Sequence, residues 1–177
     1  MRSRLLIVIA IAGIGMAALV LFFLMRSGTH REAPEFVGES PRMPALEFAD
    51  TEGVGVRLAD FAGTPLVINT WATWCPFCVK ELSDFAAIQK EFGTAVKIIA
   101  INRAQAHGAA LAYIAERGIA RDEFLFLLDP KDAWYQETGG FSMPETIFVD
   151  AAGFIRAHVR GPMEQEEMRR RIQKIIK

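Results

Sequence analysis

The sequence contains very little cysteine. Only two of its 177 residues are cysteines, Cys75 and Cys78, so the chain cannot form a wider disulfide framework. It lacks a second Cys-x-x-Cys pair, and its three histidines (His30, His107 and His158) are far apart in the chain, which argues against a zinc site. The formal net charge of −1 argues against a basic surface for nucleic acid. We therefore expect no metal, no cofactor and no nucleic-acid partner.

Charged and polar side chains are missing from one long stretch near the N-terminus. The run from Leu5 to Met25 has no charge, no proline and no polar side chain. As a helix it is long enough to span the hydrocarbon core of a membrane, about 30 Å. A cleaved signal peptide has a shorter apolar region, about 7–15 residues, so cleavage is the alternative interpretation. We expect a membrane anchor over residues 1–26, a flexible linker over 27–43 and a folded domain over 44–177.

The flanking charges do not fix the orientation of this anchor. Arg2 and Arg4 precede the apolar run, whereas Arg26, His30 and Arg31 follow it, so the positive charge is nearly balanced. The compartment must then be inferred from the cysteine pair. An anchored domain with a reactive cysteine pair suits the outer, periplasmic face of a cytoplasmic membrane, and a tethered cytosolic domain is the alternative.

The remainder of the chain alternates strand-like and helix-like patterns, which predicts an α/β domain with a right-handed βαβ unit. After the cysteines, apolar residues recur at helical spacing until Gly93, a typical C-terminal stop. The predicted elements, in order, are a hairpin over 48–58, a strand over 64–71, this helix, a strand over 96–101, a helix over 104–117, a strand over 124–128, a short helix over 133–137, a hairpin over 146–159 and a helix over 163–176.

The two cysteines follow the predicted strand and begin the predicted helix. There the positive end of the helix dipole and unpaired backbone N–H groups would stabilise a Cys75 thiolate. Cys78 follows one turn later and could close a disulfide with it. Pro76 suits a first helical turn, where no N–H is needed. Covalent haem attachment would need a histidine where Val79 stands, whereas a purely structural disulfide stays open as an alternative.

The segment WATWCPFC, the strand before it and the later Met143-Pro144 resemble the thioredoxin superfamily. More narrowly, the chain from about Pro44 to its C-terminus resembles the membrane-anchored TlpA/ResA group, which includes the DsbE (CcmG) proteins of cytochrome c maturation. This resemblance implies a thioredoxin-like fold, with a central mixed sheet flanked by helices, an N-terminal β-hairpin and an inserted helix and strand, preceded by one transmembrane helix.

The resemblance also implies a substrate-binding loop. In this family the peptide bond that corresponds to Met143–Pro144 is cis, its loop lies against the cysteines, and the backbone of the residue before the proline pairs with an extended substrate segment. Three further residues flank the cysteines, and we expect them to contribute to substrate binding: Trp74, Pro76 and Phe77. Packing beside the site is the alternative role for Trp74.

Two residues near the cysteines bear on proton transfer. Glu81 follows Cys78 by three residues, where this group often carries an active-site glutamate, and we expect it to tune the cysteine pKa values or relay a proton. The alternative is a solvated acid that the helix dipole favours. Asn69 occupies a strand position where thioredoxin carries a buried aspartate. An asparagine cannot accept a proton, so a general cytosolic reductant is not expected.

The sequence thus predicts a thiol–disulfide oxidoreductase that reduces disulfides of exported proteins, among them apocytochrome c. Cys75 would be the nucleophile and Cys78 the resolving thiol, and the resemblance implies a transmembrane electron donor of the DsbD/CcdA type. One alternative is a thiol peroxidase, which is disfavoured because no Thr-x-x-Cys pattern precedes Cys75. The other is a non-enzymatic, membrane-tethered redox sensor.

Overall fold

A computed structural model describes residues 16, 40–119 and 124–177 of the chain. The chain divides into two compact units, Met1–Glu32 and Ala33–Lys177. Of the first unit only Met16 is described, so the predicted membrane anchor (1–26) lies outside the described residues, as does most of the predicted linker (27–43). In the part of the chain that is described, no helix is both long and apolar enough to cross a membrane.

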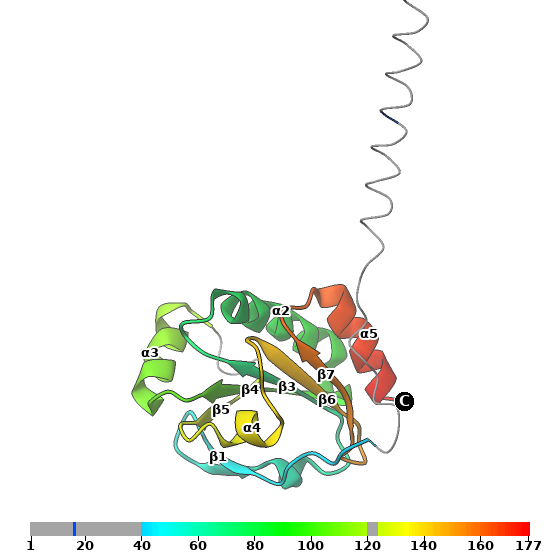
Figure 1. Cartoon of the computed structure of the whole chain (residues 1–177), viewed down its shortest axis with the longest axis horizontal. Helices are drawn as coiled ribbons and strands as arrows, with labels where there is room; N and C mark the ends of the chain where they lie inside the picture. Colours follow the sequence, from blue (N-terminus) through cyan, green and yellow to red (C-terminus); the bar gives the residue numbers. More distant parts are fainter. Residues whose placement is uncertain (1–15, 17–39, 120–123) are drawn as a thin grey trace, which may run out of the picture. The chain divides into compact units, whose positions relative to one another are not determined.

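The second unit is built on a seven-stranded sheet with the order β2-β1-β5-β4-β3-β6-β7 (Figure 1). The central strands β3, β4 and β5 are parallel to one another, and the other neighbours are antiparallel. The sheet is therefore mixed, as expected. Its strands are β1 (Glu47–Asp50), β2 (Gly55–Arg57), β3 (Leu66–Trp71), β4 (Lys97–Arg103), β5 (Leu125–Asp129), β6 (Glu145–Val149) and β7 (Ile155–Arg160).

Helices cover both faces of this sheet. The described elements are the α-helices α2 (Pro76–Phe92), α3 (His107–Glu116), α4 (Ala133–Glu137) and α5 (Gln165–Ile175), and the short 3-10 helices η1 (Leu58–Phe61) and η2 (Gly93–Ala95). Figure 1 shows α2 and α5 on one face and α4 on the opposite face. Each face has its own hydrophobic cluster, one under α2, α3 and α5 and the other under α4 and η1.

The alternation of side chains along each strand assigns residues to these two clusters. In β3, Val67 and Trp71 face α2, whereas Leu66 and Ile68 face the α4 side. Asn69 lies between Val67 and Trp71 in this alternation and therefore also faces α2. A polar residue in the middle of a fully buried strand is thus directed at the helix that carries the cysteines.

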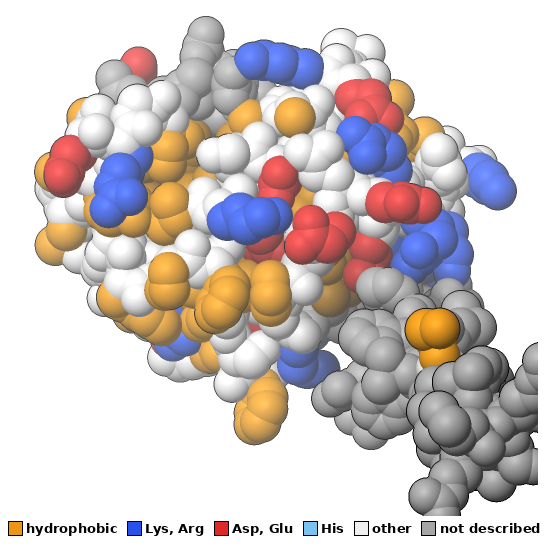
Figure 2. All heavy atoms as spheres, turned by 90° about the horizontal axis from the view of Figure 1, so that it is seen from above, with side chains coloured by type: hydrophobic (Ala, Val, Ile, Leu, Met, Phe, Trp, Pro, Cys, Tyr) orange, Lys and Arg blue, Asp and Glu red, His pale blue; other side chains and the backbone are white. Residues whose placement is uncertain are grey.

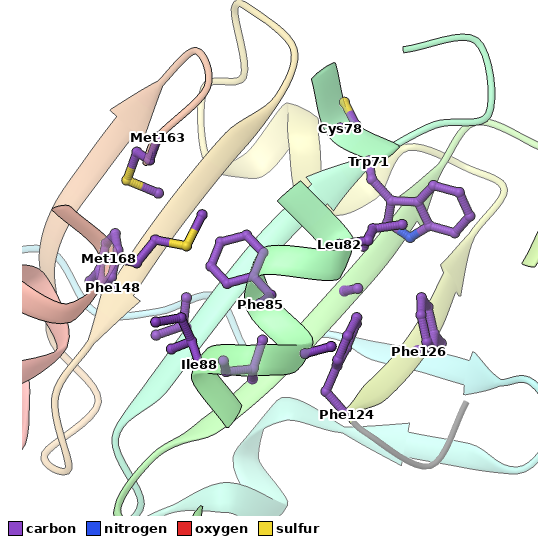
Figure 3. Close-up of a cluster of buried hydrophobic side chains, with 14 of the residues drawn as sticks. Trp71, Cys78, Leu82, Phe85, Ile88, Phe124, Phe126, Phe148, Met163 and Met168 are labelled. Carbon is purple, nitrogen blue, oxygen red and sulfur yellow. The ribbon is translucent and has the colours of Figure 1, made fainter. Parts of the chain in front are cut away.

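The face of α2 that meets the sheet is the apolar stripe that the sequence predicts. Leu82, Phe85 and Ile88 are fully buried, and Phe92 packs partly buried against the same cluster. Figure 3 shows the side chains of Leu82, Phe85 and Ile88 between the helix and the strands, with Cys78 at one end of the row. The helix ends at Gly93, whose positive φ of 54° is a backbone conformation that glycine adopts readily.

The predicted elements are present, and one boundary differs in a way that matters for the site. The sequence predicts a helix from Ala104, whereas α3 begins at His107. Arg103 still belongs to β4, and Ala104 has a left-handed φ of 51°, which an α-helix cannot contain. Residues 104–106 therefore form a loop at the carboxyl end of β4, and the domain has the thioredoxin-like α/β fold that was expected.

Candidate active site

Cys75 and Cys78 are joined in a disulfide at the N-terminus of α2, with Cα atoms 5.3 Å apart. Cys75 is the N-cap residue of the helix, and Pro76 occupies the first turn, as predicted. The backbone N–H of Cys78 donates to Cys75 Sγ at 3.2 Å. That N–H belongs to the first turn, whose donors have no partner within the helix, so it is available to stabilise negative charge on Sγ.

The two sulfurs differ in what surrounds them. Cys78 is completely buried, and Cys75 is 3% exposed. The neighbours of Cys75 in the chain, however, are among the most exposed large apolar side chains described: Trp74 is 62% exposed and Phe77 is 60% exposed. The disulfide is therefore buried in a segment whose exposed aromatic side chains, Trp74 and Phe77, form a short aromatic rim, and Cys75, the N-cap residue, is slightly more exposed than Cys78. This asymmetry fits an attacking outer thiol and a resolving inner thiol.

Glu81 is buried, with only 1% of its surface exposed, so it is not the solvated acid that the sequence left open. Its Oε1 accepts a hydrogen bond from the backbone N–H of Met163 at 2.7 Å, and its Oε2 accepts one from Asn69 Nδ2 at 3.1 Å. Burial raises the pKa of Glu81 to about 7, although these two hydrogen bonds oppose the rise. A carboxyl group that changes charge near neutral pH thus lies one turn beyond Cys78.

Asn69 forms hydrogen bonds both to this carboxyl group and to β6, the antiparallel neighbour of β3. Its Nδ2 also donates to Thr146 Oγ1 at 3.0 Å, and Thr146 is its register partner on β6. Asn69 Oδ1 is buried without a hydrogen-bond partner among the described residues. The amide is therefore a donor to Glu81 here, which favours the ionised carboxylate and partly offsets its desolvation.

The Met143–Pro144 peptide bond is cis, in agreement with what the resemblance implies. Met143 is partly buried and packs against the hydrophobic cluster that contains Cys75 and Cys78. Pro144 directly precedes β6, which pairs with β3 from Thr70↔Glu145 onward. The start of β6 and the end of β3 therefore lie at the same edge of the sheet, so the loop before Pro144 and the cysteines are brought to one site.

A buried acid that the sequence did not single out fixes this loop. Glu145 is 2% exposed, and its Oε1 accepts hydrogen bonds from the backbone N–H groups of Phe141 (2.7 Å) and Ser142 (2.6 Å). Its Oε2 lies 2.7 Å from His158 Nε2 on β7. Burial opposes ionisation of Glu145, but the hydrogen bonds from His158, Ser142 and Phe141 outweigh it and lower its pKa.

The same loop is held from the opposite side by α4. Tyr135 Oη donates to the carbonyl of Ser142 at 3.0 Å. The guanidinium of Arg103 lies 3.5 Å from the centre of the Tyr135 ring and pairs with Asp132. No pattern in the sequence relates these residues, because Arg103 ends β4, whereas Asp132 lies 29 residues later at the start of α4 and Tyr135 lies in that helix.

Phe141, at the tip of this loop, is 83% exposed and adds a third exposed aromatic side chain to Trp74 and Phe77. Figure 2 shows the surface from above, with hydrophobic side chains gathered toward the lower left and side chains of both charges spread over the rest of the view and along its edges. In the described part of the chain, no group of three His, Cys, Asp or Glu side chains is arranged to hold a metal ion.

Comparison with known proteins identifies the family. The family model named Redoxin matches residues 32–176, most of the chain. The chain belongs to the Redoxin family. This redoxin is 29% identical over 167 residues to the thiol:disulfide interchange protein DsbE of Allochromatium vinosum. The alignment covers 93% of this chain and 89% of that relative. It is 26% identical over 180 residues to the thiol-disulfide oxidoreductase ResA of Geobacillus kaustophilus. That alignment covers 99% of this chain and 94% of the relative.

Solved structures agree on the fold of this redoxin. A thiol:disulfide interchange protein of the thioredoxin family from Chlorobium tepidum superposes with a TM-score of 0.67 at 20% identity, over 80% of this chain and 100% of that one. With the curated relatives DsbE and ResA, the comparisons show that the redoxin is a thiol–disulfide oxidoreductase of the DsbE/ResA type, and its cysteine pair forms a disulfide.

Proposed function

We propose that this redoxin acts as a reductant of protein disulfides, with Cys75 as the nucleophile and Cys78 as the resolving thiol. The observation that carries the proposal is the asymmetry of the pair. Cys75 caps α2 and accepts a hydrogen bond from the Cys78 N–H, whereas Cys78 is completely buried beneath it. A thiolate stabilised at a helix N-terminus is the sulfur that attacks or is attacked.

The reaction transfers two electrons from the cysteine pair to the substrate. The Cys75 thiolate attacks one sulfur of the substrate disulfide, which forms a mixed disulfide and releases the other substrate sulfur as a thiolate. The Cys78 thiolate then attacks Cys75 Sγ, closes the Cys75–Cys78 disulfide and releases the second substrate sulfur. The substrate is reduced to a dithiol, and the redoxin is oxidised to the form described here.

Glu81 is proposed to accept the proton of Cys78 before the resolving step. Cys78 is buried, and its thiol must lose a proton to attack. Glu81 lies on the same buried helix face, and burial raises its pKa to about 7, so it can hold or release a proton at neutral pH. In the reverse direction the same carboxyl group would return the proton.

Substrate is proposed to bind across the exposed aromatic side chains and the loop before Pro144. Trp74 and Phe77 present more than half of their surface to solvent, and Pro76 between them is also exposed. The backbone of Met143 would pair with an extended substrate segment, so that a substrate disulfide reaches Cys75. Apolar side chains on either side of that disulfide would pack on the aromatic rim.

The proposed location is the outer face of a cytoplasmic membrane. The apolar run over residues 5–25 supports an anchor over 1–26 that is joined through a linker over 27–43 to the domain over 44–177. The relatives carry the names DsbE and ResA, and the resemblance to that group supports exported clients, with apocytochrome c among them, and a transmembrane electron donor of the DsbD/CcdA type. A tether would raise the local concentration of the domain near membrane-bound partners.

The test is to capture the partners on Cys75 in cells. In a Cys78→Ser variant the mixed disulfide cannot be resolved, so clients and the electron donor should accumulate as adducts that reducing agents release. The matched control is Cys75→Ser, which should capture far less because the remaining thiol, Cys78, is completely buried and does not occupy the N-cap position. Absence of adducts on Cys75, or equal capture by both variants, would overturn the proposal.

Turnover assays distinguish the remaining alternatives. The full-length chain should reduce the disulfides of insulin repeatedly when a regenerating reductant is supplied, which a sensor that acts only as a switch would not do. Rapid consumption of hydrogen peroxide with slow insulin reduction would favour the thiol peroxidase instead.

A further inference from the structure

Gln105 makes two hydrogen bonds to Thr73, a residue 32 positions earlier that lies just before the cysteine pair. Its Oε1 accepts from the backbone N–H of Thr73 at 2.9 Å, and its Nε2 donates to Thr73 Oγ1 at 2.8 Å. One amide side chain therefore holds both the main chain and the side chain of the same residue. Such a two-point contact restrains orientation as well as position.

Thr73 lies within the turn that leads into the nucleophile. The backbone N–H of Cys75 donates to the carbonyl of Ala72 at 3.1 Å, so residues 72–75 form one turn between β3 and α2. Cys75 is at once the last residue of this turn and the N-cap of the helix. A contact that fixes Thr73 therefore fixes the direction from which the chain enters α2, and with it the placement of Cys75 Sγ.

The orientation of the Gln105 amide is itself determined by its surroundings. Asn102 Nδ2 donates to the same Oε1 at 3.0 Å, so two donors converge on that atom and it must be the oxygen. The preceding residue, Ala104, adopts the left-handed φ of 51°, which is unfavourable for a residue with a side chain. The backbone N–H of Ala104 is held by the carbonyl of Asp129 at 2.9 Å. The loop is thus constrained in the conformation that directs Gln105 at Thr73.

We infer that Gln105 is a positioning residue for Cys75, an inference that rests on the proposed role of Cys75 as the nucleophile. In the oxidised protein the disulfide itself restrains Cys75. In the reduced protein that restraint is gone, and the turn before Cys75 depends on the Gln105 contact to keep Sγ beside the N–H groups of the first helical turn. Gln105 thereby sets how strongly the helix stabilises the attacking thiolate.

A charge effect does not account for this role. Gln105 is uncharged, and its contacts with Thr73 and Asn102 are to uncharged groups. Glu81, the buried titratable group on the helix face that carries Cys78, stays unchanged in every variant used below. A change in the pKa of Cys75 on removal of Gln105 would therefore report geometry at the helix N-terminus.

The test measures the pKa of Cys75 in the full-length chain with Cys78→Ser as background, so that a single thiol reacts. Alkylation by iodoacetamide is followed as a function of pH. Gln105→Ala should raise the pKa, and the alkylation rate at pH 6 should fall about three- to tenfold, equivalent to a rise of about 0.5 to 1 unit. Thr73→Val, which replaces the hydroxyl group by a methyl group of similar size, should raise the pKa less than Gln105→Ala does, and Thr73→Ser, which keeps the hydroxyl group, should have the wild-type value.

The controls separate positioning from a merely structural role. Gln173→Ala changes an exposed glutamine of α5 and should leave the rate unaltered. Gln105→Ala combined with Thr73→Val should change the pKa less than the sum of the single variants, because both remove the hydrogen bond between Gln105 Nε2 and Thr73 Oγ1. Should Gln105→Ala fail to fold, the Thr73→Val and Thr73→Ser pair carries the test alone.

An unchanged Cys75 pKa in folded Gln105→Ala or Thr73→Val would overturn the inference, even if the variants are less stable. This outcome is distinct from failure of the proposed function. The alkylation rate needs no protein substrate, whereas failure of the proposed function would appear as a wild-type chain that does not reduce insulin.

Discussion

The buried acid near the second cysteine is contributed by helix α2 and not by strand β3. Asn69 stands on β3 where thioredoxin, by the resemblance, carries an aspartate, and it donates a hydrogen bond to Glu81 on α2 at 3.1 Å. Both side chains face the same side of the sheet because Asn69 alternates in phase with Val67 and Trp71. A titratable group is thus retained beside Cys78 although the strand position cannot titrate.

Glu81→Gln should slow disulfide exchange at pH 7 by about tenfold, because the glutamine keeps the shape but cannot take the proton of Cys78. The pH dependence of exchange near pH 7 should also be lost, since burial raises the pKa of Glu81 to about 7 in the wild-type chain. Stopped-flow reduction of insulin or a peptide disulfide between pH 5 and 9 measures both effects.

The matched control for this variant is Glu116→Gln, on the exposed end of α3. It removes the same charge from the chain without touching the site, so its exchange rate should equal that of the wild type. If Glu81→Gln keeps both the wild-type rate and the wild-type pH profile, Glu81 has no role in proton transfer.

Glu81 should also make the free energy of unfolding depend on pH. Its folded pKa of about 7 is higher than the ordinary value of 4.5, so the folded chain binds more protons between these values. The contribution of Glu81 to stability should therefore be greatest below about pH 4.5, fall as pH rises to about 7 and then level off, a loss on the order of 3 kcal/mol. Denaturant titration of the wild type and Glu81→Gln should show this decline only in the wild type, and parallel curves would refute it.

At the scale of elements, the loop before β6 depends on one carboxylate. Glu145 accepts hydrogen bonds from the backbone N–H groups of Phe141 and Ser142. Its other oxygen lies against His158 of β7, and Tyr135 of α4 donates to the Ser142 carbonyl. Three elements therefore hold a segment that has no regular structure of its own. Such a loop presents its backbone to a substrate in a fixed conformation, which lowers the entropic cost of binding.

Glu145→Ala should lower the free energy of unfolding at pH 7 by about 2–4 kcal/mol, because two backbone donors and a buried imidazole lose their partner. The pKa of Glu145 is lowered in the folded chain, so its contribution is present above the ordinary carboxyl pKa and disappears as pH falls through the folded value. The difference between the variant and the wild type should therefore shrink in acid. Denaturant titrations at pH 7 and pH 3 measure it.

Glu145→Gln is the informative comparison, since its amide oxygen can still accept from the loop. It should cost less than Glu145→Ala at pH 7. Equal stability of Glu145→Ala and the wild type at neutral pH would show that the loop does not depend on this carboxylate.

At the scale of the whole molecule, the site forms beside β3, which pairs with the parallel strand β4 on one side and the antiparallel strand β6 on the other. The carboxyl ends of the parallel strands β3 and β4 carry the cysteine turn and the Gln105 loop, and the antiparallel strand β6 begins at the same edge. Every site residue described lies in the unit Ala33–Lys177. The chemistry is therefore contained in one unit, whatever precedes it.

A fragment of residues 33–177 should fold cooperatively and reduce insulin at a rate within about twofold of the full-length chain, because this unit contains both hydrophobic clusters and the whole site. Circular dichroism melting and the insulin assay measure the two properties. A fragment that folds but loses more than about tenfold in rate would show that residues 1–32 contribute to catalysis in solution.

Local patterns were enough for the elements and for the cysteine pair. The apolar stripe of α2, its stop at Gly93 and the strand before the cysteines each depend on neighbours within a few residues, and the structure has all three. The predicted start of α3 was wrong because Ala104 adopts a left-handed conformation and its backbone N–H donates to the carbonyl of Asp129, which lies 25 residues later in the chain. A helical pattern in sequence cannot reveal such a contact.

The reactive group and its setting follow from the sequence: two cysteines at the start of a helix that follows a buried strand, an arrangement that has few chemical uses. What surrounds the cysteines follows from the packing of the chain. This packing buried Glu81 and so raised its pKa, paired Glu145 with His158, and directed Gln105 at Thr73. These interactions join residues far apart in the chain, and their energies depend on burial and distance, which exist only once the sheet has formed.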